Sequence, residues 1–167
     1  MRNSGLTPDA SRADSGIAAL LLVAASMICP GCRTLPSLPP IDLSAPDWTL
    51  QQGQAVWKPI RSRPELAGEL LLATKTNGDF FVQFAKTPFT LATAQMVNGR
   101  WQIEFGAGDY QRRGAGQPPA RFVWFQLPCA LSGTEMSDHW KFERMTTNSW
   151  RLENHRTGES LEGGFFQ

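Results

Sequence analysis

The residues best suited to chemistry in this sequence are three cysteines, Cys29, Cys32 and Cys129, and two histidines, His139 and His155. Thiolates and imidazoles are the usual ligands of zinc, and a Cys-x-x-Cys pair can carry out thiol–disulfide exchange. A redox pair of that kind lies beside a strand–helix unit, whereas Cys29 and Cys32 follow an apolar run and precede a proline-rich segment. The distances along the chain to the other candidate ligands match no zinc pattern. We therefore expect no metal site and no cofactor.

The apolar run before the cysteine pair is residues 17–28, IAALLLVAASMI, which contain no charge. A bilayer core needs roughly 20 apolar residues, so this run is too short to span one. Its length is typical of the apolar region of a secretory signal, and Arg2 and Arg12 supply positive charge upstream. Residues 1–32 are therefore predicted to be a signal peptide for export.

The end of this signal resembles a bacterial lipoprotein processing site, a lipobox. Gly31 is the small residue expected before a modified cysteine, so Cys32 is predicted to carry the acyl (palmitate-type) lipid. Cleavage without lipidation and retention as an N-terminal anchor are the alternatives. Arg33 stands where an Asp commonly retains lipoproteins at the inner membrane, so we expect an outer-membrane protein that faces the periplasm. Cys129 would then be a lone thiol buried in the core.

The rest of the chain has the composition of one tethered domain. Residues 33–47 contain four prolines and are predicted to form an extended tether, and residues 48–167 to form the domain. The net charge of the whole chain is +1, which gives no basic footprint for nucleic acid. Six Trp and ten Phe accompany a single Tyr, a composition suited to a dry core or an apolar cavity.

Alternation of apolar and polar residues predicts a sheet. Asn77-Gly78 and Asn98-Gly99 are hairpin-turn signals between strand-like runs, and Trp101, Ile103 and Phe105 alternate with polar residues. The predicted strands are residues 49–57, 68–76, 79–85, 89–97, 100–105, 140–145, 149–154 and, at an edge, 160–166. We expect a loop over residues 106–119. Residues 120–131 are either a short helix interrupted at Pro128 or a buried strand.

These elements predict a mainly β (α+β) fold. It would be a curved antiparallel sheet or half-barrel of about seven or more strands, with one or two short helices. One face of the sheet would be apolar along its whole length, and a second element must cover it.

Enzyme signatures are missing from the sequence. It contains no nucleophile elbow, no HExxH, no P-loop and no dinucleotide fingerprint. His139 follows Asp138 directly, and neighbours in a strand point to opposite faces, so Asp138 is badly placed to orient His139 for catalysis. Arg112 and Arg113, beside Tyr110, can touch a phospholipid headgroup or an anionic partner, or simply belong to an exposed loop. We expect no catalytic residues and no enzyme.

Three short motifs carry a resemblance to a known family. They are Gly68-Glu69-Leu70, Lys86-Thr87-Pro88-Phe89 and Asn98-Gly99-Arg100-Trp101. In this order, after a lipoprotein tether, they resemble the periplasmic carrier and outer-membrane receptor of the lipoprotein localisation (Lol) system, LolA and LolB. The similarity covers about residues 68–133 and, more loosely, the final strands.

This resemblance implies a half-barrel closed by helices, with a hydrophobic cavity that takes an acyl chain or a lipoprotein. The protein would be a monomer held at the membrane by its N-terminal lipid, and would serve lipid or lipoprotein transport. The alternative is a non-enzymatic structural or assembly lipoprotein that acts through a protein partner. The residues expected to line the cavity are Phe80, Val82, Phe84, Phe89, Leu91, Trp101, Ile103 and Phe105.

Overall fold

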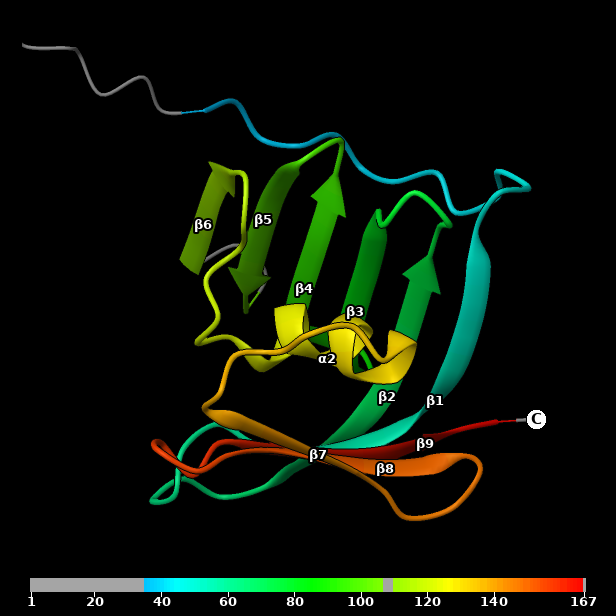
Figure 1. The fold of residues 1–167 in the computed structure, drawn as a ribbon. Helices are drawn as coiled ribbons and strands as arrows, with labels where there is room; N and C mark the ends of the chain where they lie inside the picture. The colour runs from blue at the N-terminus through cyan, green and yellow to red at the C-terminus, as the bar shows by residue number, and fades with distance from the viewer. Residues whose placement is uncertain (1–34, 107–109, 167) are drawn as a thin grey trace, which may run out of the picture. The chain divides into compact units, whose positions relative to one another are not determined.

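The structure is a computed structural model that describes residues 35–106 and 110–166. Within these residues the chain forms nine strands and one helix, α2, at Val123–Ser132 (Figure 1). The mainly β fold predicted from the sequence is confirmed. The strands are β1 (Thr49–Lys58), β2 (Leu66–Thr74), β3 (Phe80–Lys86), β4 (Phe89–Val97), β5 (Arg100–Phe105), β6 (Tyr110–Ala115), β7 (Trp140–Arg144), β8 (Ser149–Asn154) and β9 (Ser160–Phe165).

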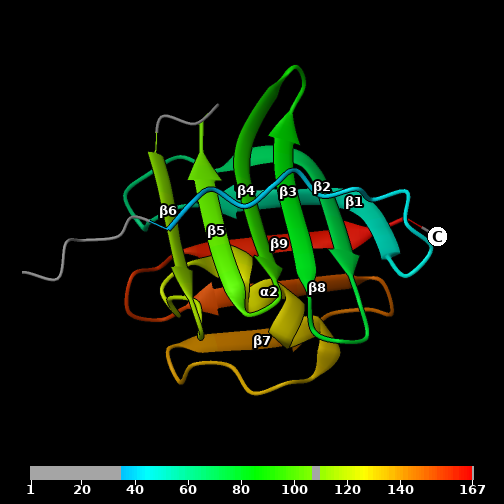
Figure 2. The same cartoon turned by 90° about the horizontal axis from the view of Figure 1, so that it is seen from above.

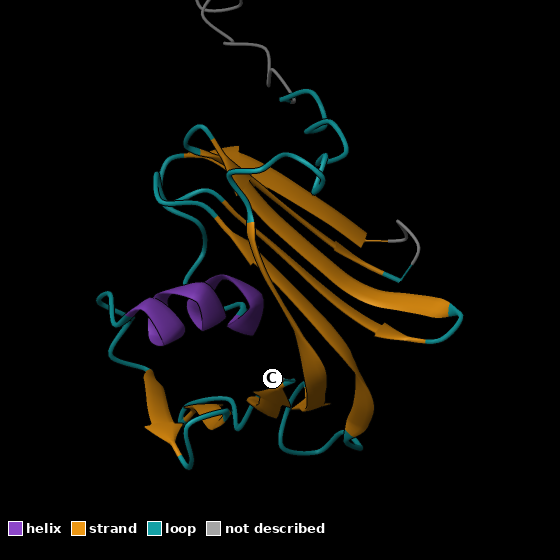
Figure 3. Ribbon diagram, turned by 90° about the vertical axis from the view of Figure 1, so that its right-hand side faces the viewer, coloured by secondary structure: helices purple, strands orange, loops and turns teal. Residues whose placement is uncertain are grey.

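All nine strands form one antiparallel sheet in the order β6-β5-β4-β3-β2-β1-β9-β8-β7. The sheet does not close on itself, because β6 and β7 end the order. It curves strongly, and α2 lies inside the curve (Figure 3). The apolar face expected to need a cover is therefore the concave face, and α2 covers it. Throughout, this face is called the inner face and the convex face the outer face.

The turn between β4 and β5 sets which side chains face inward. Asn98 and Gly99 have φ values of 51° and 71°, as in the two-residue hairpin turn predicted from the sequence. This turn pairs Met96 with Trp101 and Ala94 with Ile103. Since directly paired residues share a face, the inward positions of β4 are the even-numbered ones. Small alanines on β4 thus make room for large rings elsewhere on the inner face.

Residues 123–132 are helical, so of the two structures left open for this segment the helix is correct. Its first eight residues are buried, except that Cys129 is half-buried. Gly133 ends the helix in the left-handed region, at φ 72°, where glycine carries no steric cost. Pro128 lies inside the helix and has no N–H to donate to the preceding turn.

Two sequence-based expectations about strands are wrong. The segment 106–119 was expected to be a loop, but residues 110–115 form β6, which pairs with β5 from Arg100↔Ala115 to Phe105↔Tyr110. The segment 160–166 was expected to form an edge strand, but β9 is central, between β1 and β8. Both strands owe their position to partners that local patterns do not reveal.

Glycine allows the strands to approach closely where β1 meets β9. A Cβ atom on Gly163 would lie 2.7 Å from the carbonyl oxygen of Gln54 and 2.9 Å from the Cβ of Ala55. A Cβ on Gly53 would lie 2.0 Å from the carbonyl oxygen of Gly164. Side chains at these positions would push β1 and β9 apart, so the seam between them depends on glycine.

The proline-rich segment 35–47 is not a free tether along its described length. It crosses the outer face of the sheet, over β3, β4 and β5 (Figure 2). Leu38 is only 9% exposed there, and its N–H donates to Gln102 Oε1 at 2.8 Å. The Arg100 guanidinium donates to the carbonyl oxygen of Pro36 at 2.6 Å. We call residues 35–47 the strap.

Candidate functional site

The candidate site is a cavity of about 760 Å³ between the inner face of the sheet and α2. It lies at one end of the sheet, where β2 ends, β3 begins and β4 turns into β5. We call it the inner cavity. Its volume falls within the roughly 300–1,000 Å³ typical of small-molecule sites.

The walls of the inner cavity are apolar. The sheet supplies one wall and the second half of α2 supplies the other. Phe125 is fully buried and packs edge-on against Phe80, with ring centroids 6.1 Å apart, so it forms the inner limit of the space. The apolar lining residues are Leu72, Phe80, Met96, Pro118, Phe125, Pro128, Cys129 and Leu131. Such walls offer dispersion contacts and no directional chemistry.

Polar groups of the inner cavity lie at its rim. Lys75 Nζ forms a salt bridge with Asp47 Oδ2 at 2.6 Å and lies 4.5 Å from the centre of the Trp48 ring. The ammonium group lowers the pKa of the Asp47 carboxyl, chiefly through this hydrogen-bonded contact. The C-terminal end of the strap is thereby fixed to the rim of the cavity. The other polar lining residues are Thr49, Gln51, Thr74, Asp79, Gln117, Ser132 and Thr134.

Asp79 holds the two hairpin turns at this rim together. It is 8% exposed, its Oδ1 accepts the Asn98 N–H at 2.9 Å, and its Oδ2 accepts the Asn77 side-chain amide at 3.0 Å. A carboxylate bridging two turns fixes the distance between them, because each hydrogen bond is charge-assisted. The rim is therefore rigid on the side formed by the sheet.

The other end of the inner face is filled by aromatic rings. Trp57 stacks on Phe105 at a centroid distance of 5.9 Å and meets Trp124 edge-on at 5.1 Å. Phe84 in turn stacks on Trp124 at 5.3 Å. We call these four residues the aromatic plug. Because the plug fills the space between sheet and helix, the inner cavity is closed at the end that faces the plug.

A carboxyl group lies against this plug. Glu159 Oε1 accepts a hydrogen bond from Trp57 Nε1 at 3.1 Å. Burial raises the pKa of Glu159 to about 7, although the Trp57 hydrogen bond acts in the opposite direction. The group therefore changes its charge near neutral pH, at the end of the molecule remote from the cavity.

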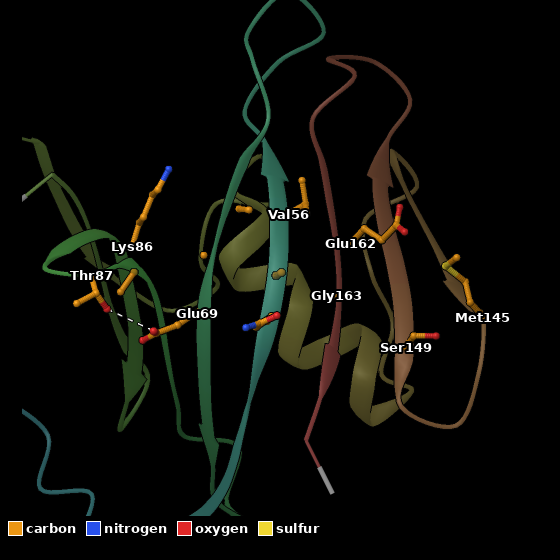
Figure 4. Close-up of a pocket in the computed structure, with 13 residues that line it drawn as sticks. Val56, Glu69, Lys86, Thr87, Met145, Ser149, Glu162 and Gly163 are labelled. Carbon is orange, nitrogen blue, oxygen red and sulfur yellow. Dashed lines mark hydrogen bonds between the residues drawn. The ribbon is translucent and has the colours of Figure 1, made fainter.

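A second hollow, of about 550 Å³, lies on the outer face (Figure 4). Its floor is made of small residues, including Ala55, Gly68 and Gly163. Lys86, Thr87 and Glu69 lie on one side of it and Glu162, Ser149 and Met145 on the other, with Val56 between them. Thr87 Oγ1 donates to Glu69 Oε1 at 3.3 Å. We call it the outer groove; charged groups of both signs line it, and it has no deep apolar wall.

The eight residues expected to line a cavity have four different environments. Phe80 lines the inner cavity, whereas Val82, Phe84 and Ile103 are completely buried beneath α2. Leu91, Trp101 and Phe105 are half-buried and pack against this core. Phe89 is 68% exposed at the start of β4, so its assignment to a cavity wall is corrected. Cys32, the predicted lipidation site, is outside the described residues.

Several lining residues were missed by sequence reasoning. Met96 was overlooked because the large residues Phe89 and Leu91 suggested the odd-numbered face of β4. The Asn98-Gly99 turn carries the correct signal, since a two-residue turn places Met96 opposite Trp101. Phe125, Cys129 and Leu131 were missed because the rotation of α2 about its axis decides which of its side chains line the cavity. The apolar composition of the helix does not indicate that rotation.

The two histidines lie together, away from the inner cavity. The rings of His139 and His155 meet edge-on at 5.9 Å, and Arg156 Nη1 lies 3.0 Å from His139 Nε2. Within residues 35–106 and 110–166, no three His, Cys, Asp or Glu side chains gather in a way that could hold a metal ion. Cys129, expected in the core, is instead half-buried on the cavity wall.

No protein-family model matches this sequence, and no curated protein matches it. Among the described helical residues, none forms a helix long and apolar enough to cross a bilayer.

Proposed function

We propose that this chain is a non-enzymatic, lipid-anchored protein of the periplasmic face of the outer membrane, which takes an acyl chain into the inner cavity. The acyl chain belongs to a lipid or to a lipoprotein that is being transported. The observation that carries the proposal is the apolar space between the sheet and α2, with walls formed by Leu72, Phe80 and Leu131.

The shape of the site suits a linear amphiphile. The aromatic plug closes one end of the inner face, and the polar rim borders the other. A hydrocarbon tail fits the apolar walls, where each buried methylene contributes about 0.8 kcal/mol. The head of the molecule stays at the rim, where hydroxyl and amide groups from Thr49, Gln51 and Thr134 can replace water.

Lys75 gives the rim a preferred charge. Its ammonium group lies on the cavity border and is held by Asp47 and Trp48. An anionic headgroup can approach this cation, although Asp47 already offsets part of its charge. Support for the acyl-carrier function also comes from the lipobox-like sequence that ends at Cys32 and from the resemblance of residues 68–133 to the Lol proteins.

The test is native mass spectrometry of the full chain after extraction from bacterial membranes. We expect a mature N-terminus at an acylated Cys32, and an additional lipid mass that is lost under strong activation. The variant Cys129→Phe adds a ring inside the cavity, and each methylene it displaces weakens binding by about fourfold. The co-purified lipid should therefore be reduced or lost.

The matched control is Val56→Phe, which adds a ring to the outer groove. It should leave the co-purified lipid unchanged, and circular dichroism should show both variants folded. Equal loss of lipid in the two variants would refute a specific role for the inner cavity. An acylated chain that never carries lipid would instead favour the structural or assembly lipoprotein. A chain that still begins at Met1 would refute processing.

A further inference from the structure

We infer that the β5–β6 edge of the sheet docks on an anionic phospholipid surface, through Arg112, Arg113 and Tyr110. The inference rests on the proposed membrane anchor for its starting point. It goes further by naming the face of the domain that meets the membrane and the headgroup chemistry that this face recognises.

The segment between the proposed anchor and the domain is short. Pro36 is already held by Arg100, and Ser37 and Leu38 by Gln102. Three residues lie between Cys32 and Pro36, so the two are four residue steps apart. An extended chain spans at most about 3.6 Å per residue, so a lipid on Cys32 lies within about 14 Å of Pro36. An apolar anchor ending at residue 28 would lie within about 29 Å of Pro36.

The β5–β6 edge of the sheet lies beside Pro36. Arg100 and Gln102, which hold the strap, belong to β5, and β6 is the next and last strand on that side of the sheet (Figure 2). Arg113 pairs with Gln102 across the two strands. The surface nearest the anchor is therefore the β5–β6 edge, and a membrane that holds the anchor meets this edge first.

β6 carries exposed cationic and aromatic side chains. Tyr110, Arg112 and Arg113 are exposed, and the Arg112 guanidinium lies 5.5 Å from the centre of the Tyr110 ring. Neither arginine forms a salt bridge with any described residue. On the last two strands at the other side of the sheet, Lys141 is paired with Glu143 on β7 and Arg151 with Glu153 on β8, whereas Arg144 on β7 has no salt bridge among the described residues.

Arginines that have no salt bridge within the described part of the chain, and that lie beside a tyrosine, suit an interface between membrane and water. Guanidinium groups bind phosphate in a fork geometry, and tyrosine rings favour the headgroup layer. An edge strand also presents unpaired backbone N–H groups, and headgroup phosphates can accept hydrogen bonds from them. A zwitterionic surface lacks the net charge that attracts two cations, so the dependence on anionic lipid is the distinguishing property.

The experiment uses the full chain, extracted from membranes and reconstituted into vesicles of phosphatidylcholine with phosphatidylglycerol. In a Cys129→Ala background, a dye is attached at one of three exposed positions: Gln111→Cys on β6, Phe89→Cys at the β3–β4 hairpin, or Met145→Cys after β7. A headgroup-labelled acceptor lipid reports the distance of each dye from the membrane. We expect the strongest energy transfer from position 111.

Charge variants test the chemistry. The double variant Arg112→Gln/Arg113→Gln should lower the transfer from position 111 in anionic vesicles and have little effect in pure phosphatidylcholine. The control Arg63→Gln/Arg144→Gln removes two exposed arginines elsewhere and should change neither. Strongest transfer from position 89 or 145, equal transfer from all three, or an equal effect of both double variants would overturn the docking surface.

The mass of the mature chain shows whether the proposed lipid anchor is present. It thereby distinguishes an error in the anchor from an error in the docking surface. If the chain proves to be cleaved without a lipid, the proposed function loses its anchor. Co-sedimentation of that chain with phosphatidylglycerol-containing vesicles then tests the docking surface without the anchor. Binding that falls by about 30-fold in Arg112→Gln/Arg113→Gln supports the docking surface, since each cation near an anionic surface contributes about 1 kcal/mol. Absence of binding overturns it.

Discussion

The two ends of the inner face are built from the same sheet and the same helix, yet one is filled and the other is open. At the filled end, Trp57, Phe84, Phe105 and Trp124 occupy the space between β1, β3, β5 and α2. At the open end, Leu72, Phe80 and Met96 leave about 760 Å³ unoccupied. The difference lies in side-chain size, because the backbone layers are continuous across both ends.

This contrast separates stability from binding within one layer. Burial of large rings at the filled end supplies the cohesion that a sheet with two free edges needs. The open end leaves some apolar surface without partner atoms, which lowers stability but provides a place for a ligand. Substitutions at the two ends should therefore have different consequences. Three substitutions at these ends, and a fourth outside both, test the comparison.

The largest effect is expected for Trp124→Ala in the aromatic plug. Trp124 is 1% exposed and contacts both Trp57 and Phe84, so its removal leaves a cavity in the densest part of the core. We expect the free energy of unfolding to fall by about 3–5 kcal/mol. Urea unfolding followed by circular dichroism measures this change. A loss below that of Phe80→Ala would show that the plug is not the main source of stability.

A smaller effect is expected for Phe80→Ala at the open end. Phe80 is 5% exposed, but one side of its ring faces the inner cavity and has no protein partner to lose. The free energy of unfolding should fall by about 2 kcal/mol, below the usual range for removal of a fully packed phenylalanine. The enlarged cavity should still co-purify lipid, which the native mass spectrum checks; complete loss of lipid at intact fold would contradict the assignment of the walls.

The third prediction concerns the carboxyl group at the filled end. The pKa of Glu159 is raised from 4.5 to about 7, so the folded state binds more protons than the unfolded state between these values. Stability should therefore decrease as pH rises from 4.5 to 7 and stay level above it. Glu159→Gln keeps an acceptor for Trp57 and should raise the free energy of unfolding at pH 8 by about 1–3 kcal/mol, with little change at pH 4. An equal change at both pH values would assign the effect to packing.

The smallest effect is expected for Phe89→Ser, which removes a large ring that belongs to neither end. Phe89 is 68% exposed, so its loss uncovers no buried surface. The free energy of unfolding should change by less than about 0.5 kcal/mol. The same urea titration measures it, and a larger loss would mean that this ring is covered in solution.

Local alternation and turn chemistry were sufficient to predict the hairpins from β2 to β5, because their partners are adjacent in sequence. They were not sufficient for β6, whose arginines and glycine lack an apolar face and which forms a strand because β5 offers it a ladder of backbone partners. The central position of β9 depends on Gly53, Ala55 and Gly163 meeting across a long stretch of chain. The cavity itself follows from differences in side-chain volume along one face. Alternation of apolar and polar residues indicates which face a side chain lies on, but not how much space it fills.

The pairing of β9 with β1 also bears on how the protein folds as its chain emerges. The first strand lies in the middle of the sheet, and Gly53 pairs with Phe165 near the other end of the described chain. A chain that emerges from its N-terminus exposes one edge of β1 until β9 arrives. Contacts of such long sequence separation form slowly, and an uncovered strand edge is prone to pair with other chains. The interval before β9 arrives is thus the time at which this protein is most vulnerable to aggregation, and at which a chaperone has an edge to protect.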